Sequence, residues 1–215
     1  MTGMPGTVVA ASQGTLHELE QAAAYLLSSI APLRIGVTDD AADLDAMFRL
    51  RGAEIVERGW ASSDMASTER DCDVHDGDAV QIAIWDAAQV VGTCRLLLPS
   101  PQRLLPLERD FALRLEPQGG VVQWSRLVLA RRIRGDPQHR IAVACFAALW
   151  RETTRRGFAH CAGVVSKPML ELYAGLGIAF EVVGPPRFVE GEQRYPAVSS
   201  TSTLRTALAV MRRLA

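Results

Sequence analysis

Two arginines occur within segments that have the apolar composition of buried strands. Arg95 lies in residues 91–99 (VGTCRLLLP), and Arg126 ends residues 121–126 (VVQWSR). A guanidinium that leaves water loses a large hydration free energy unless carboxylates pair with it, and residues 69–76 (ERDCDVHD) supply carboxylates upstream. Each arginine taken alone could also lie at a strand end with its head group in water. The combination of two strand arginines and an acidic loop favours a preformed polar site.

Length and composition describe one ordinary domain. The 215 residues are 48% hydrophobic and 22% charged, and the formal net charge is −1. Because this balance gives no broad positive field, we expect no nucleic acid among the partners, and a charged ligand must be bound by local groups. The elements predicted below divide the chain into an N-terminal helical extension (residues 1–32) and a larger α/β domain (residues 33–215).

The cysteines argue against a metal centre. Cys72, Cys94, Cys145 and Cys161 form no CxxC pair and no cluster with histidine at zinc-ligand spacing, so we expect reduced thiols and no metal site. The first residues lack a charged segment ahead of an apolar one, and no apolar run is long enough to span a membrane. We therefore expect a cytoplasmic protein that is not bound to a membrane.

Hydrophobic periodicity predicts an α/β fold with a mixed, mostly antiparallel central sheet flanked by helices. Two strands joined by a tight turn are followed by alternating strands and helices, which favours a mixed sheet over a doubly wound dinucleotide fold. Neither GxGxxG nor a Walker A sequence is present. The predicted strands are residues 33–38, 80–85, 90–98, 121–130, 158–165, 178–183 and an extended piece to 198; the predicted helices are residues 15–31, 41–58, a short one around 111–115, 141–156, 168–174 and a last one at the C-terminus.

This order of elements resembles the GNAT acyltransferase fold, and residues 45–198 resemble the acyl-homoserine-lactone synthases of the LuxI type. Residues 92–99 (GTCRLLLP) are similar to that family's Gly-x-x-Arg-Leu-x-Pro stretch, in which Arg95 is the strand arginine. Residues 71–76 (DCDVHD) match its acidic signature in a register that favours Asp73 and Asp76. The resemblance implies that these acids organise the arginines and hold the substrate.

A further match covers residues 122–126 (VQWSR), which resemble the family's Trp-Glu-x-Ser-Arg. Ser125 and Arg126 match, whereas Gln123 stands where the family has a glutamate that is often cast as general base. An amide cannot take a proton, but an α-amino group with a pKa near 8 is about one-tenth neutral at neutral pH. The resemblance thus assigns the catalytic set to Asp73, Asp76, Arg95, Gln123, Ser125 and Arg126.

The resemblance also implies binding residues for two substrates. Arg51 and Trp60 match the arginine and tryptophan that line the region for S-adenosylmethionine, although Ile55 replaces a phenylalanine. The C-terminal half is expected to hold the acyl chain. Candidate residues there are Trp124, Val164 and Met169, together with Val122, Ala162, Leu172 and Phe180.

A basic run, residues 131–140 (RRIRGDPQHR), joins a predicted strand to a predicted helix. Arg131, Arg132, Arg134 and Arg140 suit the phosphate of a pantetheine-linked donor or the acidic surface of a carrier protein, and the helix dipole would add to the attraction. A basic loop that only aids solubility is the alternative.

The resemblance implies an N-acyltransferase that makes an N-acyl-homoserine lactone, a quorum-sensing autoinducer. The substrates would be S-adenosylmethionine and an acyl thioester of acyl carrier protein or coenzyme A, with no permanently bound cofactor. An N-acyl amino acid synthase of the same fold is the first alternative, because residues 105–108 (LPLE) and 191–196 (GEQRYP) are more similar to that group. A catalytically weakened, ligand-binding relative is the second, motivated by Gln123 and Ile55.

Overall fold

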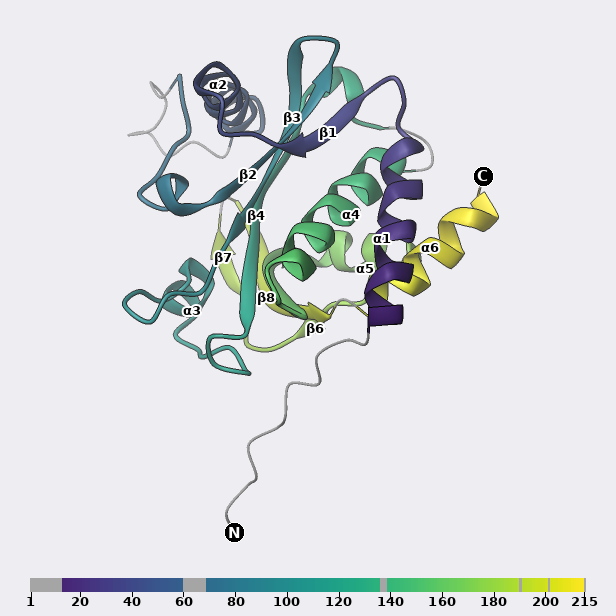
Figure 1. Ribbon diagram of the computed structural model, residues 1–215. Helices are drawn as coiled ribbons and strands as arrows, with labels where there is room; N and C mark the ends of the chain where they lie inside the picture. Colours follow the sequence, from purple (N-terminus) through teal and green to yellow (C-terminus); the bar gives the residue numbers. More distant parts are fainter. Residues whose placement is uncertain (1–12, 60–68, 136–138, 190, 201, 215) are drawn as a thin grey trace.

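A mixed sheet runs through the centre of the molecule in the computed structural model, which describes residues 13–59, 69–135, 139–189, 191–200 and 202–214 (Figure 1). The eight strands follow the order β1-β2-β3-β4-β5-β8-β6, with β7 paired to β8. Neighbours are antiparallel except for β4 and β5, which confirms the predicted mixed, mostly antiparallel sheet. The strands are β1 (Arg34–Val37), β2 (Val80–Asp86), β3 (Gln89–Leu97), β4 (Val121–Leu129), β5 (His160–Ser166), β6 (Glu181–Val182), β7 (Arg187–Val189) and β8 (Glu192–Ser200).

Helices cover both faces of this sheet. Helices α2 and α3 lie on one face, and α1, α4, α5 and α6 lie on the other (Figure 1). The helices are α1 (Gln13–Ser28), α2 (Ala41–Glu57), α3 (Pro106–Phe111), α4 (Arg140–Arg155), α5 (Lys167–Gly175) and α6 (Thr203–Leu214), with short 3-10 turns η1 (Asp76–Asp78) and η2 (Arg131–Ile133). None of these helices combines the length and the apolar character that a membrane span requires.

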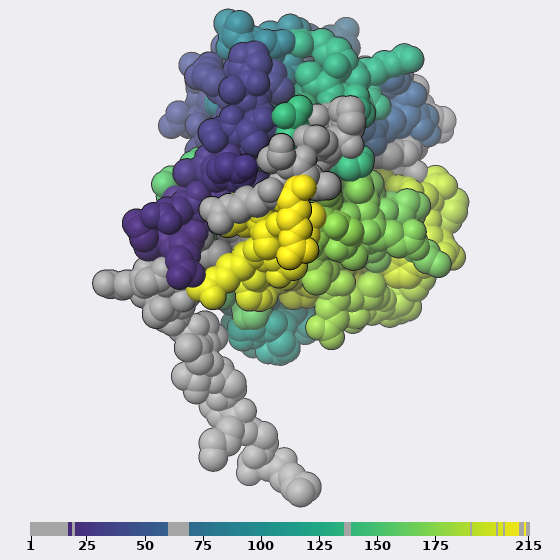
Figure 2. Space-filling model, turned by 90° about the vertical axis from the view of Figure 1, so that its right-hand side faces the viewer, coloured from purple at the N-terminus to yellow at the C-terminus, as the bar shows by residue number. Residues whose placement is uncertain are grey.

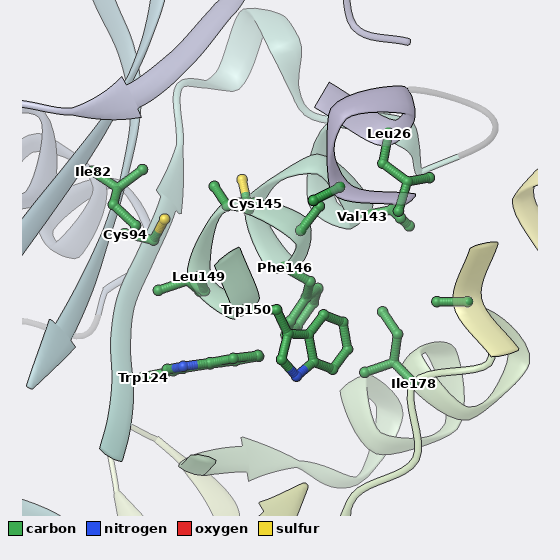
Figure 3. Packing of buried hydrophobic residues seen from close by; sticks show 14 of the residues in the cluster. Leu26, Ile82, Cys94, Trp124, Val143, Cys145, Phe146, Leu149, Trp150 and Ile178 are labelled. Carbon is green, nitrogen blue, oxygen red and sulfur yellow. The ribbon is translucent and has the colours of Figure 1, made fainter. Parts of the chain in front are cut away.

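The main core fills the space between the sheet and α4. Successive residues from Val143 to Trp150 in α4 are buried, and Trp124 of β4 contacts Phe146 and Trp150 with ring centroids 5.6 and 5.1 Å apart. Figure 3 shows Ile82 and Cys94 pointing from the sheet toward this helix. Each large apolar side chain buried here contributes roughly 1.5–3 kcal/mol.

The N-terminal and C-terminal helices complete this layer. Ala22, Ala23 and Leu26 of α1 belong to the same core, so α1 packs on α4 rather than standing apart from it. Figure 2 shows α6 (yellow) beside α1 (purple), where Arg205 pairs with Glu18 at 2.6 Å.

The register of the strands places a row of polar side chains on the sheet face that is opposite α4. Gln81 of β2 is directly opposite Arg95 of β3, which is opposite Ser125 of β4. Because side chains alternate between faces along a strand, these three share the face that α2 and α3 cover. A second apolar cluster under α3, including Leu97, Leu107, Phe111, Val121 and Ala162, closes one end of that face.

Strands β4 and β5 pair only over a short stretch. Val121 to Gln123 oppose His160 to Ala162, and the later residues of both strands are not paired with each other. The β3–β4 register shifts by one residue between Thr93 and Arg95, and Arg126 has a left-handed φ of 53°. A bulge of this kind bends a strand, so β4 diverges from β5 and leaves a gap in the sheet.

Several predicted elements shift in the structure. The helix expected around residues 111–115 lies at Pro106–Phe111 instead, because the carboxylate of Glu108 accepts the backbone N–H groups of Leu105 and Leu115 and Ala112 leaves the helix at φ 52°. The expected strand 178–183 is reduced to Glu181–Val182. Asp40 caps α2, as expected for Asp39 or Asp40, by accepting from the N–H groups of residues 42 and 43.

Candidate active site

Arg95 is at the centre of the polar row and is only 2% exposed. Its Nη1 lies 2.8 Å from Oδ1 of Asp73 and 3.0 Å from Oδ1 of Asp76. Its Nε donates to Oγ of Ser125 at 3.0 Å. One guanidinium therefore joins two acids of the 69–78 loop to β4, and its charge is compensated although it is buried.

Arg51 reaches the same acids from α2 and is 0% exposed. Its Nη1 donates to Oδ1 of Asp76 at 2.8 Å, and its Nη2 donates to Oε1 of Gln81 at 2.7 Å and to Oγ1 of Thr93 at 3.3 Å. Gln81 in turn donates to Oδ1 of Asp76 at 2.9 Å. Asp76 thus lies between two buried arginines, and Gln81 and Thr93 are members of the network that the sequence analysis did not identify.

The acidic loop is held in shape by its own backbone. The N–H of Asp73 donates to Oδ2 of Asp76, and the N–H of His75 donates to Oδ1 of Asp73, both at 2.8 Å. The N–H of Asp71 donates to the carbonyl of Phe48 in α2 at 3.0 Å. These bonds direct the carboxylates toward the sheet, so the arginines meet acids that are already positioned.

Arg126 differs from Arg95 because its side chain is about one-third exposed. Its Nε lies 2.7 Å from Oδ2 of Asp71, and its Nη2 lies 3.5 Å from Oδ2 of Asp73. The structure therefore brings Arg95 and Arg126 to a shared acid, Asp73, as the sequence led us to expect. It also adds Asp71, a buried carboxylate that was part of the acidic run but was not assigned a role.

Electrostatics keep the two central acids ionised. Burial raises the pKa of Asp76, but the backbone N–H of Asp73 and the side chains of Arg51 and Gln81 outweigh it, and the net pKa is well below the ordinary value. Burial also raises the pKa of Asp73, but the ion pair with Arg95 lowers it by more, so the net pKa is below the ordinary value. Arg51 shows the converse: burial lowers its pKa, and Asp76 partly restores it. The network is therefore a set of ion pairs near neutral pH.

A cavity of about 570 Å³ passes through the gap between β4 and β5. The charged lining lies mainly on the α2 side, and the apolar and aromatic lining lies mainly on the α4 and α5 side. The charged lining residues are Arg51, Arg58, Asp71, Arg126, Arg134, Glu192 and Arg194. The apolar lining includes Trp124, Phe146, Leu149, Met169, Leu172 and Phe180, which belong to the core around α4, together with Ile55 of α2 and Val164 of β5. One cavity can thus accept a ligand that is polar at one end and apolar at the other.

The predicted binding residues divide into several groups. Arg51, Trp124, Val164 and Met169 line the cavity, as do Ile55, Leu172 and Phe180. Trp60 lies outside the described residues. Val122 and Ala162 are fully buried in the two cores instead, because they lie where β4 and β5 are still paired.

Gln123 is turned away from this cavity. Its Oε1 accepts the backbone N–H of Leu107 in α3 at 2.9 Å, and the residue is 4% exposed. It is not among the residues that line the cavity. The side chain at this position therefore fixes α3 to the sheet.

The arginines of the basic loop contact acids of the protein itself. Arg131 lies 3.5 Å from Glu57, and Arg132 contacts Asp86 at 2.5 Å on the β2–β3 turn. Arg134 pairs with Glu54 and Glu57 of α2 and lines the cavity. Arg140 is the first residue of α4. Of these four arginines, Arg134 is the one placed at the cavity wall, and donor binding by the set stays a prediction.

Tyr173 is a cavity residue that the sequence analysis passed over. It lies on α5 and packs edge-on against Phe146, with ring centroids 4.6 Å apart. Within the described part of the chain its hydroxyl has no hydrogen-bond partner. Burial raises its pKa strongly, so it is a protonated donor that faces a cavity. A polar residue on the apolar face of a helix beside the β4–β5 gap was the available signal.

Comparison with known proteins agrees with this architecture. Residues 50–144 match the family model described as the acetyltransferase (GNAT) domain. No curated protein sequence matches the chain. The chain has the GNAT acyltransferase fold.

Solved structures with this fold include three that are informative. The AHL synthase LasI is 19% identical with a TM-score of 0.67, covering 82% of this chain and 93% of LasI. BjaI, a CoA-dependent acyl-homoserine lactone synthase with SAM and isopentyl-CoA, is 24% identical with a TM-score of 0.62, covering 80% and 82%. FeeM, an N-acyl amino acid synthase from uncultured soil microbes, is 13% identical with a TM-score of 0.65, covering 84% and 97%.

Proposed function

We propose that the protein is an N-acyltransferase that makes an N-acyl-homoserine lactone from an acyl thioester and S-adenosylmethionine. The observation that carries this proposal is the cavity through the β4–β5 gap, with ion-paired arginines on one side and an apolar lining on the other. An acyl chain suits the apolar part, and an amine with a charged carboxylate suits the polar part. The likeness in fold to LasI and BjaI supports this choice of substrates.

In this proposal the thioester carbonyl lies beside β4, where the strand bulges at Arg126. The neutral α-amine attacks that carbonyl, and the C–S bond breaks as the amide forms. Backbone N–H groups of the bulged strand would stabilise the oxyanion. Holding both reactants in one cavity supplies much of the rate enhancement, because attack no longer depends on a bimolecular encounter.

Proton transfers need no glutamate at position 123. About one-tenth of a free α-amine is already neutral at neutral pH, so unassisted deprotonation costs about 1.4 kcal/mol. The hydroxyl of Tyr173 is protonated and faces the cavity, so it can give a proton to the departing thiolate while it takes up the proton that the amine nitrogen loses as the amide forms. The carboxylate of the acylated S-adenosylmethionine then attacks its own γ-carbon, which closes the lactone and releases methylthioadenosine.

The buried network acts as the support of the site. Asp73 and Asp76 hold Arg95, and Arg95 donates to Ser125 beside the bulge. Arg126 and Asp71 form the polar wall. Charges that are fixed before substrate binds do not have to reorganise during the reaction. The enzyme would act in the cytoplasm and take its acyl group from coenzyme A or an acyl carrier protein.

The test is product analysis with purified protein, S-adenosylmethionine and a panel of acyl thioesters, resolved by mass. We expect acyl-homoserine lactone as the product. If free amino acids are acylated and S-adenosylmethionine is not, the protein is an N-acyl amino acid synthase, which the likeness to FeeM and the glutamine at position 123 favour as second candidate. If ligands raise the melting temperature but no product forms, the chain is a binding relative.

A further inference from the structure

His75 is a buried histidine that the proposed reaction does not use. It is 7% exposed, lies directly before η1 in the acidic loop and lines a hollow of about 20 Å³ beside the loop between β3 and α3. Within the described part of the chain its ring has no hydrogen-bond or ion-pair partner. The other residues that line the hollow are Leu97, Leu98, Leu104, Leu105 and Pro106, which are apolar, with Ser100 and the exposed pair Asp78 and Arg103.

The backbone of His75 is connected to the central ion pairs. Its N–H donates to Oδ1 of Asp73 at 2.8 Å, and the same oxygen atom lies 2.8 Å from Nη1 of Arg95. The N–H of Asp73 in turn donates to Oδ2 of Asp76 at 2.8 Å. The His75 ring and both carboxylates are therefore carried by one tight turn, and a displacement of the ring would move the acids that hold Arg95.

The surroundings of the ring favour its neutral form. Burial lowers the pKa of the His75 imidazole. The carboxylate of Asp73 raises that pKa, whereas the guanidiniums of Arg103, Arg95 and Arg109 lower it, and the net pKa is below the ordinary value. The hollow has space for about one water molecule, so an imidazolium in it would lose most of its hydration. A protonated ring is therefore more stable outside the hollow, in solvent.

We propose that His75 is a positioning residue whose neutral ring keeps Asp73 and Asp76 in place, and whose protonation displaces the acidic loop and weakens its hold on Arg95. The inference rests on the proposed acyl transfer and adds a pH dependence to it. One proton from water binds a ring nitrogen, and no other bond forms or breaks.

The pH range of this effect follows from the direction of the pKa shift. Because the imidazole pKa is lower in the folded protein, the stabilisation by the neutral ring is complete above the unfolded pKa of about 6.5. It is lost as the pH falls below that value toward the folded pKa. This range lies above the one in which Asp73 and Asp76 take up protons.

His75→Leu removes the titrating group, and leucine matches the apolar lining of the hollow. His17→Leu is the matched control, because His17 is exposed on α1, where it hydrogen-bonds to Gln21. The experiment measures kcat/KM with an acyl thioester and S-adenosylmethionine between about pH 7.5 and pH 5. The quantity compared is the ratio of variant to wild type at each pH, in which the titration of the amine substrate cancels.

We expect the ratio for His75→Leu to rise by at least about threefold from the highest to the lowest pH, because only wild type loses activity through this ring. His75→Gln, which also stays neutral, should show the same rise. The ratio for His17→Leu should stay constant. A ratio that is constant with pH in both His75 variants, whatever its value, would overturn the inference and leave the ring a packing role only.

Unfolding free energies distinguish a failure of this inference from a failure of the proposed function. If no product forms at any pH, the proposed acyl transfer is wrong, and urea titrations of the same proteins then decide the role of His75. Wild type should lose stability relative to His75→Leu between about pH 6.5 and pH 5. Parallel curves for the two proteins would reject the inference.

Discussion

Asp76 and Arg51 form a 2.8 Å ion pair in which the side chains are 6% and 0% exposed. Removing one partner of a buried pair leaves an uncompensated charge, which costs roughly 3–5 kcal/mol. We expect Asp76→Asn to lower the free energy of unfolding by about that amount in urea titrations. Asp78→Asn is the control, because the exposed Asp78–Arg103 pair should contribute less than about 1 kcal/mol. Equal effects of the two substitutions would contradict the network.

Acid should weaken the fold through the same residues. The pKa values of Asp73 and Asp76 are lower in the folded protein than in ordinary carboxyls. Their stabilisation is therefore complete above the unfolded pKa of about 3.9 and is lost as pH falls below it toward the folded values. Unfolding free energies measured between about pH 5 and pH 3 should fall more steeply for wild type than for Asp76→Asn. Parallel curves would show that Asp76 is not paired in solution.

Arg95 should not tolerate lysine. Its guanidinium contacts Asp73, Asp76 and Ser125 at once, and a single ammonium cannot reproduce that geometry. We expect Arg95→Lys to reduce kcat/KM by at least about 100-fold, a loss of roughly 2.7 kcal/mol. Arg103→Lys, on an exposed pair, is expected to keep turnover. Equal activity of Arg95→Lys and Arg103→Lys would contradict this role of Arg95.

Gln123→Glu should give no catalytic gain. The side chain is directed to α3, where it accepts the N–H of Leu107, and it does not line the cavity. A carboxylate buried there loses its hydration, which lowers the stability of the fold. The expected kcat/KM is within about threefold of wild type or lower. A gain of tenfold or more would mean that the side chain reaches the amine during the reaction.

Tyr173→Phe tests the proton donor. Without the hydroxyl, release of the thiolate should slow by about 10²-fold with alkyl thioesters. Thiophenyl esters leave without protonation, so the defect should shrink strongly with them. A defect of equal size for both leaving groups would assign Tyr173 to packing alone.

Much of the fold could be predicted because each strand and helix carries its own periodic pattern. Strands β2 to β5 and helix α4 appear within a few residues of the predicted positions, since alternating or helical spacing of apolar residues specifies them locally. Helix α3 could not be placed, because its limits depend on two hydrogen bonds to Glu108 and a left-handed residue at 112. Those features leave no periodic signal.

The site could be predicted from the sequence where a charged residue lies in a segment that has the composition of a buried strand. Arg95, Asp73 and Asp76 stood out because a strand arginine requires acids. Gln81 and Thr93 did not stand out, since polar residues are ordinary in strands. The role of Gln81 arises from its register opposite Arg95, and that of Thr93 from its hydrogen bond with Arg51 of α2. The acidic partners of Arg131, Arg132 and Arg134 come from α2 and the β2–β3 turn, and only tertiary structure brings those distant residues together.

The most direct test of the central claim is the stoichiometry of two small products. Purified protein is incubated with an acyl thioester and S-adenosylmethionine, and free thiol and methylthioadenosine are quantified together over time. Lactone synthesis predicts that one molecule of methylthioadenosine is released for each molecule of thiol. In Arg95→Lys, the release rates of both products should fall by at least about 100-fold. Thiol release without methylthioadenosine would contradict the account, because the acyl group would then have gone to water or to another amine.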